Sequence, residues 1–278
     1  MNASSSTIGK PARPQSAAGR DPTAVLVTGA SSGIGEALAR RFARDGHRLV
    51  LAARSVPRLE ALAAELRARH GVTVDVAGVD LQDPHGAQRL HDELARRGIR
   101  VGVLVNNAGF GTFGEFRDSA LATDLQMVQL NVASVVALAK LFLPDLLDAR
   151  GRILNTASTA AFQPGPYMAV YYATKAFVLS FSEALAEELA GSGVTVTALC
   201  PGPTASGFQD KADLHASALV KGKRLPTAEQ VAEVGYRALQ RGQRVVIPGA
   251  MNWLMAQSVR FTPRRLVTSM VRTLSRPV

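Results

Sequence analysis

The chain has 278 residues, of which 47% are apolar, and this combination suits a single α/β domain with a substantial core. Its one cysteine, Cys200, excludes an internal disulfide and indicates a reducing compartment such as the cytoplasm. No unbroken apolar run reaches the roughly 18–20 residues that span a bilayer. Residues 1–21 are rich in Ser, Ala and Pro and lack the apolar segment of a secretory signal, so we expect a disordered tail.

The formal net charge is +10, and much of it lies toward the C-terminal end, where eight arginines and no acidic residue follow Glu233. A solvated basic surface explains this pattern, and contact with an anionic membrane surface is the alternative. Nucleic acid is not expected as a partner, because the chain contains no recognisable nucleic-acid-binding module.

Short apolar runs alternate with amphipathic segments along the whole chain. The runs predict strands at residues 25–27, 49–53, 72–79, 101–105, 152–155, 194–199 and 244–247. Between them, helical spacing predicts helices at residues 34–45, 57–70, 84–97, 121–147, 171–190 and 227–241. Strands and helices that alternate at this spacing predict an α/β fold, with a doubly wound parallel sheet in one domain.

The first predicted strand runs into a glycine-rich turn that opens the first helix, Thr28-Gly29-Ala30-Ser31-Ser32-Gly33-Ile34-Gly35. Gly29 permits the tight turn, while Gly33 and Gly35 remove side chains where backbone meets a pyrophosphate and where helix meets strand. The helix N-terminus then offers amides to phosphate, and the hydroxyls of Ser31 and Ser32 add hydrogen bonds. In this strand–turn–helix context, the run predicts a Rossmann-type dinucleotide site.

Tyr171 and Lys175 stand four residues apart, which places them on one face of a helix. A lysine beside a tyrosine favours the phenolate and should lower the pKa of Tyr171, which can then act as a general acid or base. Ser158 lies thirteen positions upstream, where its hydroxyl can steady a reacting carbonyl oxygen. Tyr172 has the wrong spacing to Lys175, and we interpret it as a packing residue.

Together these motifs resemble the short-chain dehydrogenase/reductase family, in its single-domain subfamily, over residues 22–250. The resemblance also covers Asn106-Asn107-Ala108-Gly109, Asn131 and Pro201-Gly202. It implies that Lys175 also holds the nicotinamide ribose, and that Asn131 holds a water in a proton relay. It further implies cofactor contacts from Asp80, Leu81, Asn107, Ala108, Gly109, Pro201 and Gly202. The hydroxyl that binds the nicotinamide carboxamide comes from Thr204 or from Ser206.

The residue after the second strand distinguishes NAD from NADP. An NAD site usually has a carboxylate there, which binds the ribose 2′-hydroxyl. This chain instead has Arg54, followed by Ser55, and a guanidinium pairs well with a 2′-phosphate. The expected cofactor is therefore NADP(H), and no metal site is predicted.

The sequence contains no specific motif for the substrate pocket. By resemblance, residues 207–226 form a mobile lid. The apolar candidates for the pocket suggest a lipophilic ketone, aldehyde or acyl chain, and they are Phe110, Phe113, Phe162, Met168 and Phe208. Tyr167 is expected to line or to cover this pocket.

Residues 251–278 form a basic extension whose apolar side chains follow helical spacing from Arg264 to Leu274. One interpretation is a helix packed on its own subunit or a neighbour, and the other is a helix that lies on a membrane surface.

The sequence thus predicts a cytoplasmic, NADP(H)-dependent oxidoreductase that interconverts a small-molecule carbonyl and an alcohol. A dehydratase or epimerase of the same fold is a rival, and a non-catalytic NADP-binding regulator is the alternative from another class. The complete set of Asn131, Ser158, Tyr171 and Lys175 favours catalysis. The resemblance also implies a homodimer or homotetramer.

Overall fold

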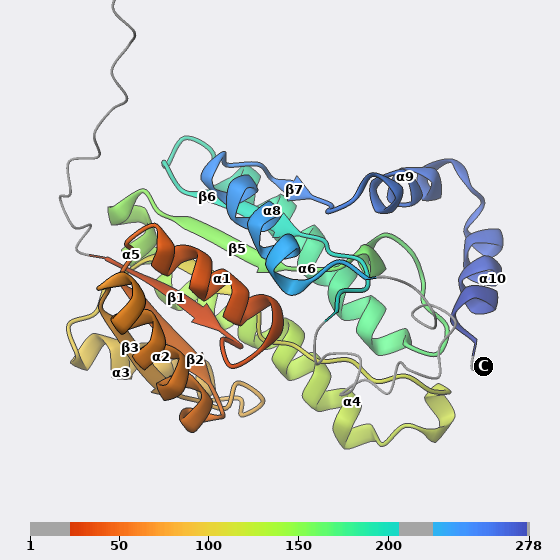
Figure 1. Cartoon of the computed structure of the whole chain (residues 1–278). Helices are drawn as coiled ribbons and strands as arrows, with labels where there is room; N and C mark the ends of the chain where they lie inside the picture. The colour runs from red at the N-terminus through yellow and green to blue at the C-terminus, as the bar shows by residue number, and fades with distance from the viewer. Residues whose placement is uncertain (1–22, 206–224, 277–278) are drawn as a thin grey trace, which may run out of the picture.

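Seven parallel strands in the order β3-β2-β1-β4-β5-β6-β7 form the centre of the computed structural model, which describes residues 23–205 and 225–276 (Figure 1). The strands are β1 Ala24–Thr28, β2 Leu49–Ala53, β3 Val74–Gly78, β4 Val101–Asn106, β5 Arg152–Thr156, β6 Thr195–Leu199 and β7 Val245–Val246. The longer helices are α1 Gly33–Arg44, α2 Val56–His70, α3 Gly86–Arg96, α4 Leu121–Val128, α5 Ser134–Ala149, α6 Ala169–Glu188, α8 Ala228–Gln240, α9 Ala250–Ser258 and α10 Arg264–Ser275. The predicted doubly wound parallel sheet is confirmed.

The strands alternate their side chains between two apolar layers. From β1, Val25 and Val27 pack with α1, α2 and α8 on one face, while Ala24 and Leu26 pack with α3, α5 and α6 on the other. Both faces of the sheet are therefore covered by helices. This explains why the strand sequences are continuous apolar runs and do not alternate between apolar and polar residues. The chain moves outward from β1 to β3 and returns to place β4 beside β1. A crevice at the carboxyl ends of β1 and β4 follows from this reversal.

The predicted long helix spans α4, a π-helical turn at Gln129–Ala133 and α5. It is long and apolar enough, by length and composition alone, to cross a membrane. Charged residues such as Lys140 interrupt it, so it is not an unbroken apolar run. It packs on β4, α3 and α6, as a core helix of a globular domain does.

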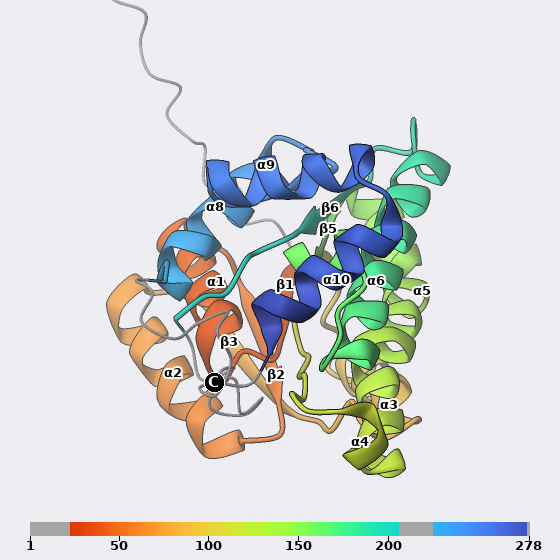
Figure 2. The same cartoon turned by 90° about the vertical axis from the view of Figure 1, so that its right-hand side faces the viewer.

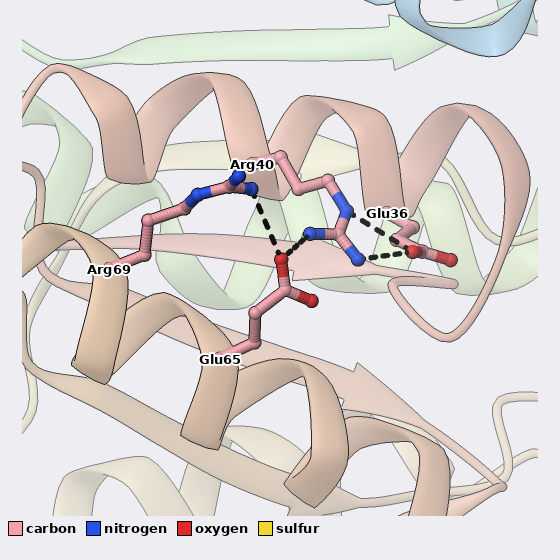
Figure 3. Close-up of polar contacts among 4 residues, drawn as sticks. All are labelled: Glu36, Arg40, Glu65 and Arg69. Atoms are coloured by element: carbon pink, nitrogen blue, oxygen red, sulfur yellow. Dashed lines mark hydrogen bonds and ion pairs between the residues drawn. The ribbon is translucent and has the colours of Figure 1, made fainter.

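Four charged side chains join α1 to α2 on the outer surface (Figure 3). Arg40 lies between two carboxylates, with one guanidinium nitrogen 2.8 Å from Glu36 and another 2.5 Å from Glu65. Arg69 approaches the same Glu65 oxygen at 3.5 Å. The Arg40 guanidinium lowers the pKa of Glu65, so this group of charges is complete at neutral pH.

The C-terminal helices α9 and α10 lie on one side of the molecule, beyond β7 (Figures 1 and 2). Val267 and Val271 of α10 are buried against Met168 and Tyr172 at the start of α6. Of the two interpretations of the extension, packing on its own chain therefore holds for this face of α10. The predicted tail at residues 1–21 and most of the predicted lid lie outside the described residues.

Candidate active site

A cavity of about 790 Å³ opens at the carboxyl ends of the strands, across the crevice between β1 and β4. This size suits a dinucleotide with a small substrate. The residues predicted for catalysis or cofactor binding line the cavity, with the exception of Gly33, Gly35 and Asn131. They are Gly29, Ser31, Ser32, Ile34, Arg54, Asp80, Leu81, Asn107, Ala108, Gly109, Ser158, Tyr171, Lys175, Pro201, Gly202 and Thr204. Residues that follow six strands, β1 to β6, thus meet in one place.

Two glycines of the turn between β1 and α1 have no space for a side chain. Gly29 has a φ of +65°, and a Cβ there would lie 2.9 Å from the Cα of Ala108. A Cβ on Gly35 would lie 2.4 Å from the carbonyl oxygen of Gly29, so this glycine serves the packing of α1 on the turn. The side chain of Ser32 does not cap α1, which leaves the first-turn amides available to an anion. This bare turn at a helix N-terminus fits the pyrophosphate of a dinucleotide.

The end of β4 is tied to the end of β1 by hydrogen bonds. The hydroxyl oxygen of Thr28 accepts from the backbone N–H groups of Asn107 and Ala108, at 3.0 and 3.1 Å. The side-chain amide of Asn107 donates to the carbonyl oxygen of Thr28 at 3.1 Å. These bonds fix the crevice walls, so Asn107 has a structural role as well as a position in the cavity.

The far end of the cavity carries two cations. Arg54 follows β2 and donates to the side chain of Gln82 at 3.1 Å. Arg58, in the first turn of α2, lines the same part of the cavity. Asp80 accepts from the backbone N–H of Gln82 at 2.9 Å, which orients the carboxylate at the end of β3. Arg58 was not predicted as a site residue. Its position four residues after Arg54, at the start of the predicted second helix, could have indicated a second cation near the 2′-phosphate.

Tyr171, Ser158 and Lys175 meet on the opposite side of the cavity. Burial raises the pKa of Tyr171 to about 12, while a hydrogen bond with Ser158 acts in the other direction. Burial also lowers the pKa of Lys175 to about 8. The expected lowering of the Tyr171 pKa by Lys175 is thus not found. The reason is geometric, because the Lys175 ammonium donates to the carbonyl oxygen of Thr156 at 2.8 Å and lies 5.8 Å from the tyrosine ring centroid.

Asn131 lies in the π-helical turn and is buried behind the cavity wall. Its side chain accepts from the backbone N–H of Phe110 at 3.1 Å, and donates to the Phe110 carbonyl oxygen at 2.9 Å and to the Thr174 hydroxyl at 3.1 Å. Asn131 thereby joins the loop after β4 to α6, next to Lys175. Such π turns are frequent at functional sites.

The sequence profile described as short chain dehydrogenase matches residues 23–216. The chain belongs to the short-chain dehydrogenase family. Sulfoacetaldehyde reductase 2 from Chromohalobacter salexigens is 41% identical over 187 residues, which cover 66% of this chain and 73% of that protein.

Two solved structures show the same fold at higher coverage. A short-chain dehydrogenase from Sphingobium yanoikuyae in complex with NADPH is 35% identical, with a TM-score of 0.77 over 86% of this chain and 94% of that one. An alcohol dehydrogenase from Comamonas testosteroni, described as specific for bulky-bulky ketones, is 32% identical, with a TM-score of 0.73 over 86% of this chain and 92% of that one. This short-chain dehydrogenase is accordingly an NAD(P)-dependent oxidoreductase that acts between alcohols and carbonyl compounds.

The substrate side of this short-chain dehydrogenase differs from the prediction. Among the described residues no phenylalanine lines the cavity. Phe113 packs with Met168 and Tyr172 against α10, and Phe162 packs against the cluster around Cys200. Phe208, like Ser206, lies outside the described residues.

The apolar wall near Tyr171 contains one of the predicted candidates, Met168, and otherwise comes from segments that were not predicted. Its members are Met168, Tyr172, Leu225, Pro226, Met251 and Met255. Tyr172 therefore lines the cavity as well as packing. Tyr167 is absent from the lining and stacks at a tilt on Phe113, with 6.0 Å between ring centroids. The two α9 methionines were missed, because α9 itself has no clear helical pattern.

Proposed function

We propose that this short-chain dehydrogenase is an NADP(H)-dependent reductase of lipophilic ketones or aldehydes, with Tyr171 as the general acid. The observation that carries the proposal is the meeting of Tyr171, Ser158 and Lys175 beside a bare glycine turn in one cavity. A proton donor and a dinucleotide site at the same cavity are what carbonyl reduction requires.

The preference for NADP(H) rests on Arg54 and Arg58. Both line the cavity at the end of β2, where a 2′-phosphate would meet two guanidinium groups and no carboxylate from β2. The solved relatives include complexes with NADPH and with NAD, so our proposal of NADP(H) is based on the positive charges of Arg54 and Arg58.

The remaining cofactor contacts follow from the lining. The turn at Gly29 with Ser31 and Ser32 would hold the pyrophosphate. Asp80 and Leu81 would hold the adenine, and Lys175 the nicotinamide ribose. Thr204 is buried at the nicotinamide side, and its hydroxyl donates to the carbonyl oxygen of Gly202 at 2.9 Å. It is our candidate for the carboxamide contact.

In reduction, the Tyr171 hydroxyl donates its proton to the substrate oxygen, and the Ser158 hydroxyl steadies the charge that develops there. The cofactor, when bound, supplies the hydride. The protonated Lys175 would hold the nicotinamide ribose, and Asn131 joins the loop after β4 to the helix that carries Tyr171 and Lys175. A raised pKa keeps Tyr171 protonated at neutral pH, which suits the reductive direction.

A lipophilic substrate is proposed because the wall beside Tyr171 consists mainly of methionine, leucine, proline and tyrosine side chains. Methionine is flexible and adapts to irregular apolar shapes. The bulky-ketone description of the Comamonas testosteroni relative agrees with this choice.

We further propose a homodimer or homotetramer in the cytoplasm. Large apolar side chains are exposed along α4, α5 and α6, including Leu121, Leu125, Val136 and Phe177, and such a stripe fits a second copy of the chain. The free, buried Cys200 agrees with a reducing compartment.

The deciding experiment measures oxidation of NADPH, and separately of NADH, with ketones and aldehydes of graded chain length. We expect turnover with NADPH that Tyr171→Phe lowers by at least about 10²-fold, while binding of NADPH is retained. Tyr172→Phe is the matched control and should keep most activity. If NADPH binds tightly but no carbonyl in the series is reduced, the non-catalytic regulator is favoured instead.

A further inference from the structure

Exposed apolar side chains are concentrated in the C-terminal helices. In the part of the chain that the structure describes, seventeen large apolar residues are exposed, and eight of them belong to α9, α10 and their connection. Two of them, Met251 and Met255, line the cavity. The other six form what we call the C-terminal face, namely Trp253, Leu254, Phe261, Leu266, Met270 and Leu274. Phe261 is 88% exposed, which is unusual for an aromatic side chain that has no partner to meet.

Three of the six residues form a stripe on α10. Leu266, Met270 and Leu274 recur every four residues and therefore form one stripe along the helix. The adjacent stripe, Val267 and Val271, is buried on the protein. The apolar surface of α10 is thus wider than its contact with the domain, and half of it faces outward. Figure 2 shows α9 and α10 on the same side of the molecule, toward the viewer.

The charged side chains of the segment that carries the face are all basic. Residues 251–278 contain five arginines and no acidic residue. Arg260, Arg264 and Arg265 are exposed, and no ion pair joins them to an acidic group among the described residues. A surface with protruding aromatic and aliphatic groups beside unpaired arginines is complementary to anionic lipid headgroups over an acyl layer.

We propose that the C-terminal face docks this protein on membranes that contain anionic lipids. A second copy of the chain fits the face poorly, because a two-fold contact would bring like-charged arginines together. A separate apolar stripe on α4, α5 and α6 is available for self-association. The docked orientation also places the cavity close to the lipid, since Met251 and Met255 of α9 line it. The proposal does not depend on the reaction that the cavity catalyses.

The test is co-sedimentation of the full-length chain with vesicles of phosphatidylcholine alone, and of phosphatidylcholine with phosphatidylglycerol. We expect binding to the anionic vesicles only, weakened by added salt. Reversing two charges in Arg264→Glu/Arg265→Glu should weaken the partition by about tenfold or more. Trp253→Ser/Phe261→Ser should weaken it as well, because it removes the groups that insert.

Matched controls change exposed residues elsewhere on the surface. Arg44→Glu/Arg96→Glu reverses two charges on α1 and α3, and Phe116→Ser removes an apolar side chain that is 68% exposed. NADPH binding by each variant shows that it is folded. The proposal is overturned if the native chain ignores anionic vesicles at low salt, or if the controls lose as much binding as the test variants. It is also overturned if Trp253→Ser/Phe261→Ser converts an oligomer into a monomer in sedimentation velocity, because the face then belongs to a second copy.

Discussion

The ammonium group of Lys175 donates a hydrogen bond to the backbone carbonyl oxygen of Thr156 at 2.8 Å. Thr156 is the last residue of β5, so the central sheet itself holds the ammonium in place. Lys175 is only 5% exposed, and this burial lowers its pKa to about 8, while burial raises the pKa of Tyr171 to about 12. At neutral pH both groups carry their protons, which is the state that a proton donor needs.

The first prediction concerns the pH dependence of reduction. We expect kcat/KM to be level from about pH 6 to 7 and to fall as Lys175 loses its charge around pH 8, since a neutral lysine has one donor fewer for Thr156 and for the nicotinamide ribose. Steady-state kinetics of NADPH oxidation across this range measures the profile. Arginine stays charged, so Lys175→Arg should remove the decline near pH 8 even though its absolute rate is lower. A decline that persists unchanged in Lys175→Arg would assign it to another group.

Stability should respond to the same lysine. Its pKa falls from 10.5 to about 8 on folding, so the unfolded chain binds more protons between these values and the folded state gains stability as pH rises. From pH 8 to 9 we expect the native chain to gain about 1 kcal/mol in free energy of unfolding relative to Lys175→Met, which lacks this titrating group.

Denaturant titration of the cofactor-free protein measures this gain. The range must stop near pH 9, because Cys200 and Tyr171 have raised pKa values of about 12 in the folded state. Their unfolded forms release protons earlier, which lowers stability at higher pH. Equal slopes for the native chain and Lys175→Met between pH 8 and 9 would contradict the assignment.

The sheet and the catalytic group were predictable because they follow from local patterns. Fully buried strands such as β4 are unbroken apolar runs, and the residues after each strand must meet at one edge of a parallel sheet. Tyr171 and Lys175 needed only the helical spacing of α6. Patterns of this kind do not depend on distant contacts.

The wall of the substrate pocket was not predictable in the same way. Phe113 and Phe162 lie near Tyr171 and Ser158, but their side chains are packed in clusters behind the cavity. Part of the wall comes instead from α9, where Met251, Trp253, Leu254 and Met255 point in several directions and give no helical pattern. The position of α9 on the domain decides which of these side chains line the cavity. That position depends on tertiary contacts and cannot be inferred from the local sequence.

The third prediction concerns the positive charges of Arg54 and Arg58 and the preference for NADP(H). Arg54→Ala should lower kcat/KM for NADPH by about tenfold or more and leave NADH little changed, because a charge-assisted contact contributes roughly 1.5–3 kcal/mol. Arg54→Ala/Arg58→Ala should lose more than either single variant, if both meet the 2′-phosphate. Arg96→Ala, on the exposed side of α3, is the control. Steady-state kinetics with both cofactors measures the ratio, and an unchanged ratio in the double variant would remove these arginines from the site.

The α9 methionines give a prediction on substrate size. Met255 lines the cavity, whereas its neighbour Leu254 is exposed outside it, so the two residues form a matched pair on one helix. Met255→Ala should lower kcat/KM for long-chain ketones by about 5- to 30-fold, as expected for loss of roughly 1–2 kcal/mol of apolar contact, and should leave short ketones unaffected. Leu254→Ala should change neither. An equal decrease for short and long ketones would show that Met255 supports the fold of the site rather than contacting the substrate chain.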